Sequence, residues 1–187
     1  DVNLSELVDN NIDIFRMTVP KNINLKVDSP QDDIFVKGDL NQIQQVMMNL
    51  LINASEAVDG KTGTIEIATG AQYCDESLIS RSLLPEKPEP QDMAFIRVSD
   101  DGGGMDIETV KRIFEPFFST KFTGRGLGMS VVHGVVRGHH GAVTIDSQPG
   151  VGTTVTVYLP LLYRTGHAEG AQDSEESCTA LTEEKSP

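Results

Sequence analysis

The chain has 187 residues, enough for one well-buried domain with a tail to spare, and its formal net charge is −13. That charge argues against broad binding to nucleic acid or anionic membranes, and no apolar stretch is long enough to span a membrane. Cys74 and Cys178 form neither a metal-ligand spacing nor a disulfide framework, so we expect a cytoplasmic location. We also expect the chain to begin within a longer protein, whose full length can be membrane-anchored.

Apolar periodicity predicts helices that alternate with short strands along the chain. Helical spacing is typical of 4–15, 39–59, 106–113 and 127–138. Strand-like alternation is found at 22–28, 33–38, 63–70 and 92–100, and twice within 141–160 around a Pro-Gly turn. The segment 71–91 contains three prolines and is predicted to be a surface excursion. This order predicts an α/β fold, a two-layer sandwich.

The C-terminal residues differ in composition from the rest of the chain. From Gly166 onward there are five Glu and one Asp with almost no large apolar residues, which is typical of a disordered tail or linker. We therefore assign residues 1–163 to the folded domain and 164–187 to an acidic tail.

The helix predicted at 39–59 has two faces. Asp39 is expected to cap it, and Gln42 is expected to complete a capping box. Its core face contains Ile43, Val46, Met47, Leu50, Leu51, Ala54 and Val58. A polar stripe contains Gln42, Gln45, Asn49, Asn53 and Glu56. The stripe is either a solvated face or, since Asn is a poor helix former, a set of amide oxygens suited to Mg²⁺.

Two glycine-rich stretches are candidate ligand sites. Asp100 and Asp101 end a strand and are followed directly by three glycines. In the loop 114–126, the three Phe residues at its start are at least partly a core cluster, and Lys121 and Arg125 are the charges that follow them. The glycines at 126 and 128 can bring backbone amides to an anion at the start of the next helix. The chain lacks the GxxxxGK[ST] pattern of a P-loop.

Five segments in order resemble the boxes of the histidine kinase catalytic (ATP-binding) domain, of the gyrase, Hsp90, histidine kinase and MutL superfamily. The N box resembles NQIQQVMMNLLINASEA at 41–57, and the first glycine box resembles DDGGG at 100–104. The F box resembles FEPFFST, the second glycine box GRGLG at 124–128, and the last one GVGTT at 150–154. The resemblance implies a mixed, mostly antiparallel sheet of about five strands. It also implies three main helices on one face of the sheet (the Bergerat fold) and a flexible ATP lid.

The resemblance also implies a ligand and its contacts. The ligand is Mg·ATP, with Asp100 accepting a hydrogen bond from the adenine amine and with Gly102 and Gly104 letting the backbone pass close to the purine. Asn53, together with Asn49, is implied to bind Mg²⁺. Further implied nucleotide contacts are Glu56, Met105, Phe114, Lys121, Gly124, Arg125, Gly126, Leu127, Gly128, Thr153 and Thr154.

The chain departs from the family pattern at two positions that bear on the reaction. Asn49 stands where gyrase-like ATPases have a Glu that activates water, so fast hydrolysis is not expected. Glu56 stands where many histidine kinases have a basic residue, so Lys121 or Arg125 is expected to meet the γ-phosphate. Asp101 stands where Asn is frequent, and it is assigned no separate role.

Because the four histidines, His133, His139, His140 and His167, lack the context of a phosphoacceptor, we expect the acceptor on another domain. The expected function is transfer of the γ-phosphoryl group to a His on an upstream dimerisation domain of a homodimer. The phosphoryl group would then pass to a response-regulator receiver domain, which can be fused downstream. The alternatives are a degenerate nucleotide-binding scaffold, a Ser/Thr kinase of the anti-sigma type and a slow ATPase. No nucleic-acid partner and no direct membrane contact are expected.

Overall fold

The computed structural model of the chain describes residues 1–30, 32–119 and 126–165. Its helices are α1 (Leu4–Thr18), α2 (Leu40–Ala57), α3 (Glu76–Ser80), α4 (Ile107–Arg112) and α5 (Gly128–Gly138). Its strands are β1 (Val2–Asn3), β2 (Ile23–Asp28), β3 (Asp33–Val36), β4 (Gly63–Cys74), β5 (Gln91–Asp100), β6 (Ala142–Gln148) and β7 (Gly152–Thr165). No helix within these three ranges is long and apolar enough to cross a membrane.

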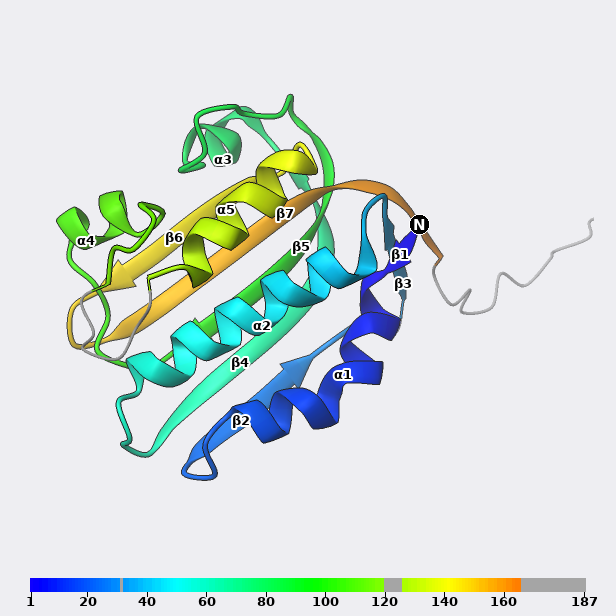
Figure 1. Ribbon diagram of the computed structural model, residues 1–187. Helices are drawn as coiled ribbons and strands as arrows, with labels where there is room; N and C mark the ends of the chain where they lie inside the picture. The colour runs from blue at the N-terminus through cyan, green and yellow to red at the C-terminus, as the bar shows by residue number, and fades with distance from the viewer. Residues whose placement is uncertain (31, 120–125, 166–187) are drawn as a thin grey trace, which may run out of the picture.

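The strands form one mixed sheet in the order β1-β3-β7-β5-β4-β2, with β6 paired to β7. Only β2 and β4 among the described pairs are parallel. Helices α1, α2 and α5 lie on one face of the sheet (Figure 1), which confirms the predicted two-layer sandwich. The described sheet has seven strands rather than about five. The two-residue β1 could not be predicted because it is too short to show alternation.

The main core fills the space between the sheet and the three helices. Its largest fully buried side chains include Phe15, Ile43, Met47, Leu51 and Ile67. Because successive strand residues point to opposite faces, a second and smaller cluster forms on the other face. That cluster joins Cys74, Met93, Ala142 and Tyr158 to Ile79 of α3. Burial raises the pKa of the Cys74 thiol, so this side chain acts as an apolar filler.

The segment 71–91 is more ordered than a surface excursion. Strand β4 continues to Cys74, and the chain after α3 then runs along the outer edge of β6. The Leu83 amide donates to the Val143 carbonyl at 2.9 Å, and the Val143 amide donates to Ser82 Oγ at 3.3 Å. Leu84 is 2% exposed and anchors this stretch in the core. The sequence predicted a surface segment that contains the three prolines, but not the hydrogen bonds that this segment makes along the edge of β6.

Helix α2 begins as predicted, with Asp39 as its N-cap, but the second half of the predicted capping box is not formed. Asp39 Oδ1 accepts from the amides of Asn41 and Gln42 at 2.8 and 3.1 Å. The Asp39 amide, which the expected capping box would pair with Gln42, instead donates to His139 Nε2 at 3.3 Å. His139 Nδ1 lies 2.7 Å from the Val135 carbonyl oxygen, so the ring links the end of α5 to the start of α2. The capping box was therefore wrong in its second half, because a distant residue supplies the partner.

Candidate functional site

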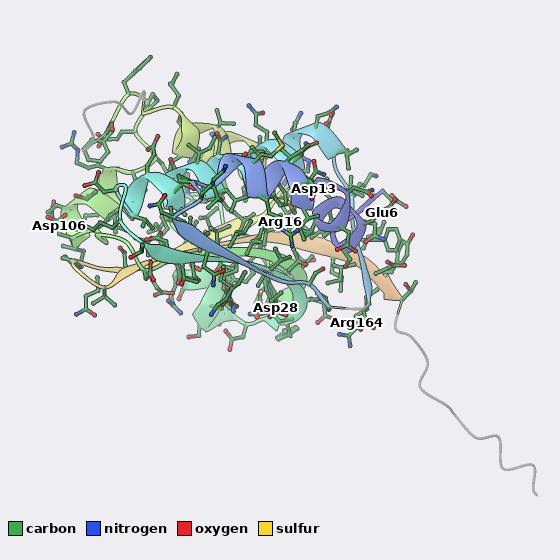
Figure 2. The ribbon with its side chains drawn as sticks, turned by 90° about the horizontal axis from the view of Figure 1, so that it is seen from below. Glu6, Asp13, Arg16, Asp28, Asp106 and Arg164 are labelled. Atoms are coloured by element: carbon green, nitrogen blue, oxygen red, sulfur yellow. The ribbon has the colours of Figure 1, made fainter. Side chains whose placement is uncertain are left out.

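A cavity of about 1160 Å³ lies between α2, the end of β5 and the beginning of α5. Most of the predicted site residues that the structure describes line it. Those lining it are Asn49, Asn53, Glu56, Asp100, Gly102, Gly104, Met105, Gly126, Leu127, Gly128 and Thr153. Lys121, Gly124 and Arg125, predicted as lid residues, lie outside the described residues. The cavity is at the end of the molecule that carries Asp106, whereas Glu6 and Arg164 mark the opposite end (Figure 2).

Asp100 is the last residue of β5 and is placed by the strands on both sides of it. It is paired with Ile65 of β4 and with Thr153 of β7, and its side chain is half-buried at the cavity. Its Oδ1 accepts from the Gly102 amide at 2.9 Å. This bond fixes the carboxylate relative to the backbone. An anionic acceptor held in this way forms strong hydrogen bonds with N–H donors of a ligand.

Asp101, to which the sequence assigned no role, ties the end of β5 to the start of β4. Its Oδ1 and Oδ2 accept from the Thr64 amide at 2.8 and 3.0 Å. A Cβ on Gly63 would come within 2.5 Å of Asp101 Oδ1, so the close approach requires glycine there. The carboxylate next to Asp100 is therefore a structural clamp. Neither the DDGGG pattern nor the strand spacing predicted it, because the contact depends on the pairing of β4 with β5.

The three glycines after Asp101 pass between the end of α2 and the β6–β7 turn. The Gly103 amide donates to the Ala57 carbonyl at 3.0 Å, and the Gly103 carbonyl accepts from the Gly150 amide at 2.7 Å. Gly104 has φ +64°, and a Cβ there would lie 1.9 Å from the Gln148 carbonyl oxygen. Gly102 is similarly close to the Ala57 carbonyl oxygen, at 2.4 Å. Gly102 and Gly104 are thus needed for close packing between backbone segments. This reason is additional to the expected approach of the backbone to a purine.

Asn49 and Asn53 lie one turn apart on α2 and face the beginning of α5. A Cβ on Gly128 would be 3.6 Å from Asn49 Oδ1 and 3.5 Å from Asn53 Oδ1. Asn49 Nδ2 is buried and has no hydrogen-bond partner among the described residues. The polar stripe is therefore not a solvated face at these two positions. Two amide oxygens that face one cavity fit the preference of Mg²⁺ for oxygen ligands.

A metal site built from ionisable side chains is not found in the described part of the chain. No group of three or more His, Cys, Asp and Glu residues there could hold a metal ion. A cation at this cavity would therefore take few protein ligands and complete its shell with water and ligand oxygens. That arrangement is usual for Mg²⁺ bound with phosphates.

The helix α5 begins at the cavity without a side-chain cap. Leu127 occupies the N-cap position and makes no capping hydrogen bond, and Gly128 is the first helical residue. The amides of a first helical turn have no partners within the helix and carry partial positive charge. The start of α5 next to the Asn49 and Asn53 oxygens can therefore receive an anionic group together with its cation.

Two of the predicted ligand contacts in the described residues do not line the cavity. Phe114 packs against His133 of α5, with ring centroids 5.5 Å apart. Thr154 Oγ1 lies 2.9 Å from Ser99 Oγ, whereas its neighbour Thr153 is in the cavity and contacts Ser147 Oγ at 2.9 Å. Adjacent strand residues point to opposite faces, so only one of the two threonines can reach the cavity.

The third side of the cavity is formed by α4 and the residues after it. Thr109, Ile113, Phe118 and Ser119 line it, and α4 has no buried residue. Phe117, expected to be partly in the core, is 78% exposed and has φ 66°. The Phe117 amide donates to the Gly126 carbonyl at 2.9 Å, which ties the segment after α4 to the residues before α5. Sequence reasoning did not distinguish Phe118 from its neighbours, because three similar aromatic residues stand within five positions.

Helix α4 is capped by Asp106, whose Oδ1 accepts from the Thr109 amide at 2.8 Å. Hydrogen bonds from the Thr109 backbone and then from its side chain lower the pKa of the Asp106 carboxyl below its ordinary value. The cap is therefore stronger when this exposed carboxylate is ionised.

The comparisons with known proteins identify the family of the chain. Residues 38–163 match the family described as "Histidine kinase-, DNA gyrase B-, and HSP90-like ATPase". The chain is 37% identical over 156 residues to "Sensor kinase CckA" of Brucella abortus, covering 82% of this chain and 16% of that protein. It is 34% identical over 126 residues to "Signal transduction histidine-protein kinase AtoS" of Escherichia coli, covering 67% of this chain and 18% of that protein. The chain thus spans less than a fifth of the length of these two relatives.

Solved structures show the same fold. The nucleotide-free catalytic domain of histidine kinase ThkA aligns with a TM-score of 0.67 at 27% identity, covering 85% of this chain and 93% of that one. The mycobacterial sensor histidine kinase MprB aligns with a TM-score of 0.67 at 23% identity, covering 86% of this chain and 97% of that one. The likeness to MprB, at 23% identity, supports the fold alone.

Proposed function

Because the chain belongs to the histidine kinase-, DNA gyrase B- and HSP90-like ATPase family, we propose that it is the catalytic domain of a two-component sensor histidine kinase. The domain binds Mg·ATP and donates the γ-phosphoryl group to a histidine on another domain. One observation supports this most directly: Asp100 and the amide pair Asn49 and Asn53 line the same cavity. Ala57, beside the Asp100 loop, is eight residues after Asn49 on α2, which corresponds to about 12 Å along the helix. That length suits a ligand with a base at one end and phosphates at the other.

At the base end, Asp100 accepts a hydrogen bond from the exocyclic amine of adenine. A carboxylate is an acceptor only, and guanine would present a carbonyl oxygen at the corresponding position. Two acceptors would then face each other, so the site favours ATP over GTP. Gly102, Gly104 and Met105 form the neighbouring wall of the cavity.

At the phosphate end, Asn53 and Asn49 hold Mg²⁺ through their amide oxygens, and the first amides of α5 meet the phosphates. Gly126, Leu127, Gly128 and Thr153 line this part of the proposed nucleotide site. Bound Mg²⁺ supplies neutralisation of phosphate charge. We propose Lys121 and Arg125 as the cations that approach the γ-phosphate, and Gly124, which lies between them in the sequence, as a further nucleotide contact.

The chain favours transfer to an acceptor over attack by water. Asn49 occupies the position from which a general base would activate water, and an amide cannot remove a proton at neutral pH. A histidine acceptor needs no such base, because a neutral imidazole nitrogen attacks with its own lone pair. The new P–N bond forms as the bond from the γ-phosphorus to the ADP oxygen breaks. The domain contributes position and charge neutralisation.

The partners of this reaction lie on other domains. The relatives are much longer than this chain. We infer an upstream dimerisation domain that carries the acceptor histidine, a homodimeric full-length protein in the cytoplasm or anchored to the membrane, and a receiver domain as the next acceptor. Because β7 continues to Thr165, the boundary predicted at 163 lies two residues too early. We propose that the domain covers 1–165 and that residues 166–187 form an acidic linker after it.

The proposal is tested with the isolated chain and with a fusion that restores an acceptor domain. The isolated chain should bind Mg·ATP, hydrolyse it slowly and fail to label itself with the γ-phosphate. The fusion should give an acid-labile, alkali-stable phosphoprotein, and there Lys121→Ala and Arg125→Ala should lower transfer more than ATP affinity. An acid-stable label would indicate a Ser/Thr kinase, and brisk hydrolysis by the chain alone would indicate an ATPase. Binding without any transfer would indicate a scaffold.

A further inference from the structure

Arg112, the last residue of α4, contacts a ring that forms part of the cavity wall. Its guanidinium carbon lies 4.3 Å from the centroid of the Phe118 ring. Its Nε also donates to Glu115 Oε2 at 3.0 Å. The Arg112 side chain is 55% exposed and is not among the residues that line the cavity. It therefore reaches the cavity only through Phe118.

The backbone between Arg112 and Phe118 brings the two side chains together. The Glu115 amide donates to the Arg112 carbonyl at 2.8 Å, and the Phe118 amide donates to the Glu115 carbonyl at 3.1 Å. These two successive turns bring the ring against the guanidinium, and Glu115 also bonds to the guanidinium. Phe114 packs on α5 and the Phe117 amide bonds to Gly126, but α4 itself has no buried residue.

We propose that Arg112 is a positioning residue for nucleotide binding and that it acts by holding the Phe118 ring in the cavity wall. This inference rests on the proposed function of the cavity. Without the guanidinium, the ring of a half-buried Phe on an exposed segment gains rotamer freedom, and nucleotide binding must then remove that freedom. The cation also attracts the ring face directly, and this attraction is modest at an exposed site. Arg112 contacts no nucleotide atom in this arrangement.

The test compares Mg·ATP affinity, measured by calorimetry, in the unmodified chain and in Arg112→Leu. A loss of about two- to five-fold is expected, as for an exposed cation–π contact. Arg112→Lys should restore part of the affinity, because an ammonium keeps the charge but stacks less well on a ring. The matched control is Lys111→Leu on the same helix. Lys111 is 60% exposed and pairs with Glu108 at 2.9 Å, so its loss removes an equivalent surface ion pair and should leave affinity unchanged.

A double-mutant cycle separates positioning from a general effect on α4. In a Phe118→Ala background, Arg112→Leu should cause no further loss of affinity, because the ring through which it acts is absent. Equal losses in both backgrounds would overturn the inference, as would unchanged affinity in Arg112→Leu or an equal loss in Lys111→Leu. Failure of the unmodified chain to bind Mg·ATP would instead count against the proposed function. Circular dichroism of each variant identifies any protein that does not fold. If Arg112→Leu does not fold, the Mg·ATP affinity of Arg112→Lys tests the inference instead.

Discussion

The two sides of the cavity are built in different ways. The side formed by the end of β5, the glycine loop and the β6–β7 turn is fixed by backbone contacts that leave no room for a Cβ. On the side formed by α4 and Phe118, the helix has no buried residue and the Phe118 ring is contacted by the exposed Arg112 side chain. Since the first side is continuous with the core, substitutions that add a Cβ among these backbone contacts should affect folding and binding together. Substitutions on the second side should affect binding, with at most a small effect on stability.

The largest effect is expected from Gly104→Ala, on the tightly packed side. A Cβ there would lie 1.9 Å from the Gln148 carbonyl oxygen, and the backbone has φ +64°. We expect the free energy of unfolding to fall by about 3 kcal/mol. Denaturant unfolding measures this, and Mg·ATP affinity should fall in the same variant.

The matched control is Gly134→Ala in α5, where no atom lies within 4 Å of the added Cβ. It should raise the free energy of unfolding by up to about 1 kcal/mol, because Ala is the better helix former. Equal unfolding midpoints for the two variants would show that the close packing around Gly104 is not what stabilises this side.

The second-largest effect is expected on nucleotide affinity, in the Asp100→Asn variant. An amide can present a donor to the adenine amine and lacks the charge, so ATP binding should weaken by roughly 1–3 kcal/mol while the fold persists. Calorimetry with ATP and GTP measures it. Asp101→Asn is the control, because it removes a neighbouring charge but keeps an oxygen for the Thr64 amide. Unchanged ATP affinity in Asp100→Asn, or equal affinity for GTP in the unmodified chain, would refute the assignment.

Asn53→Ala should remove the Mg²⁺ dependence of ATP binding without weakening α2, since Ala favours the helix. ATP affinity measured with and without Mg²⁺ gives the result. Gln45→Ala is the control, because Gln45 belongs to the same polar stripe but does not line the cavity. Unfolding of Asn53→Ala, or an unaltered Mg²⁺ effect, would mean that Asn53 serves the structure of the helix.

The smallest effect concerns Asp106 on the exposed side. The pKa of Asp106 is lower in the folded protein than in the unfolded chain. The stability that the ionised carboxylate contributes is therefore fully present above the unfolded pKa. The contribution is lost as the pH falls through the lower, folded pKa. Asp106→Asn should therefore lower Tm slightly at pH 7, and this difference should shrink toward pH 3. Thermal unfolding across that range measures it, and a constant difference would exclude the carboxylate cap.

Local patterns in the sequence predicted much of the fold and part of the candidate site. The Asp39 cap, the core face of α2 and the Pro-Gly turn between β6 and β7 depend on nearby residues, and all three are found. Contacts between distant segments were not predicted. The His139 bond to the Asp39 amide joins residues 100 positions apart, and the Asp101 bond to Thr64 joins residues 37 apart.

Within the candidate site, the order of the motifs identified the residues but not their orientation. Thr153 and Thr154 are equivalent in the sequence, and only the pairing of β7 with β5 decides which one faces the cavity. Likewise, the three Phe residues at 114–118 form one apolar group in the sequence. In the structure Phe114 packs on α5, Phe117 is exposed and Phe118 lines the cavity.

The stretch at 82–84 that runs along β6 has a consequence for how the domain behaves at high concentration. An uncovered strand edge is a template on which a second molecule can add a strand, and such additions can continue into polymers. The Leu83 and Ser82 bonds occupy both backbone groups of Val143 on that edge. Shortening the loop between β4 and β5 would therefore do more than trim the surface. It would uncover a strand of apolar and β-branched residues and convert one side of the sheet into a site of self-association.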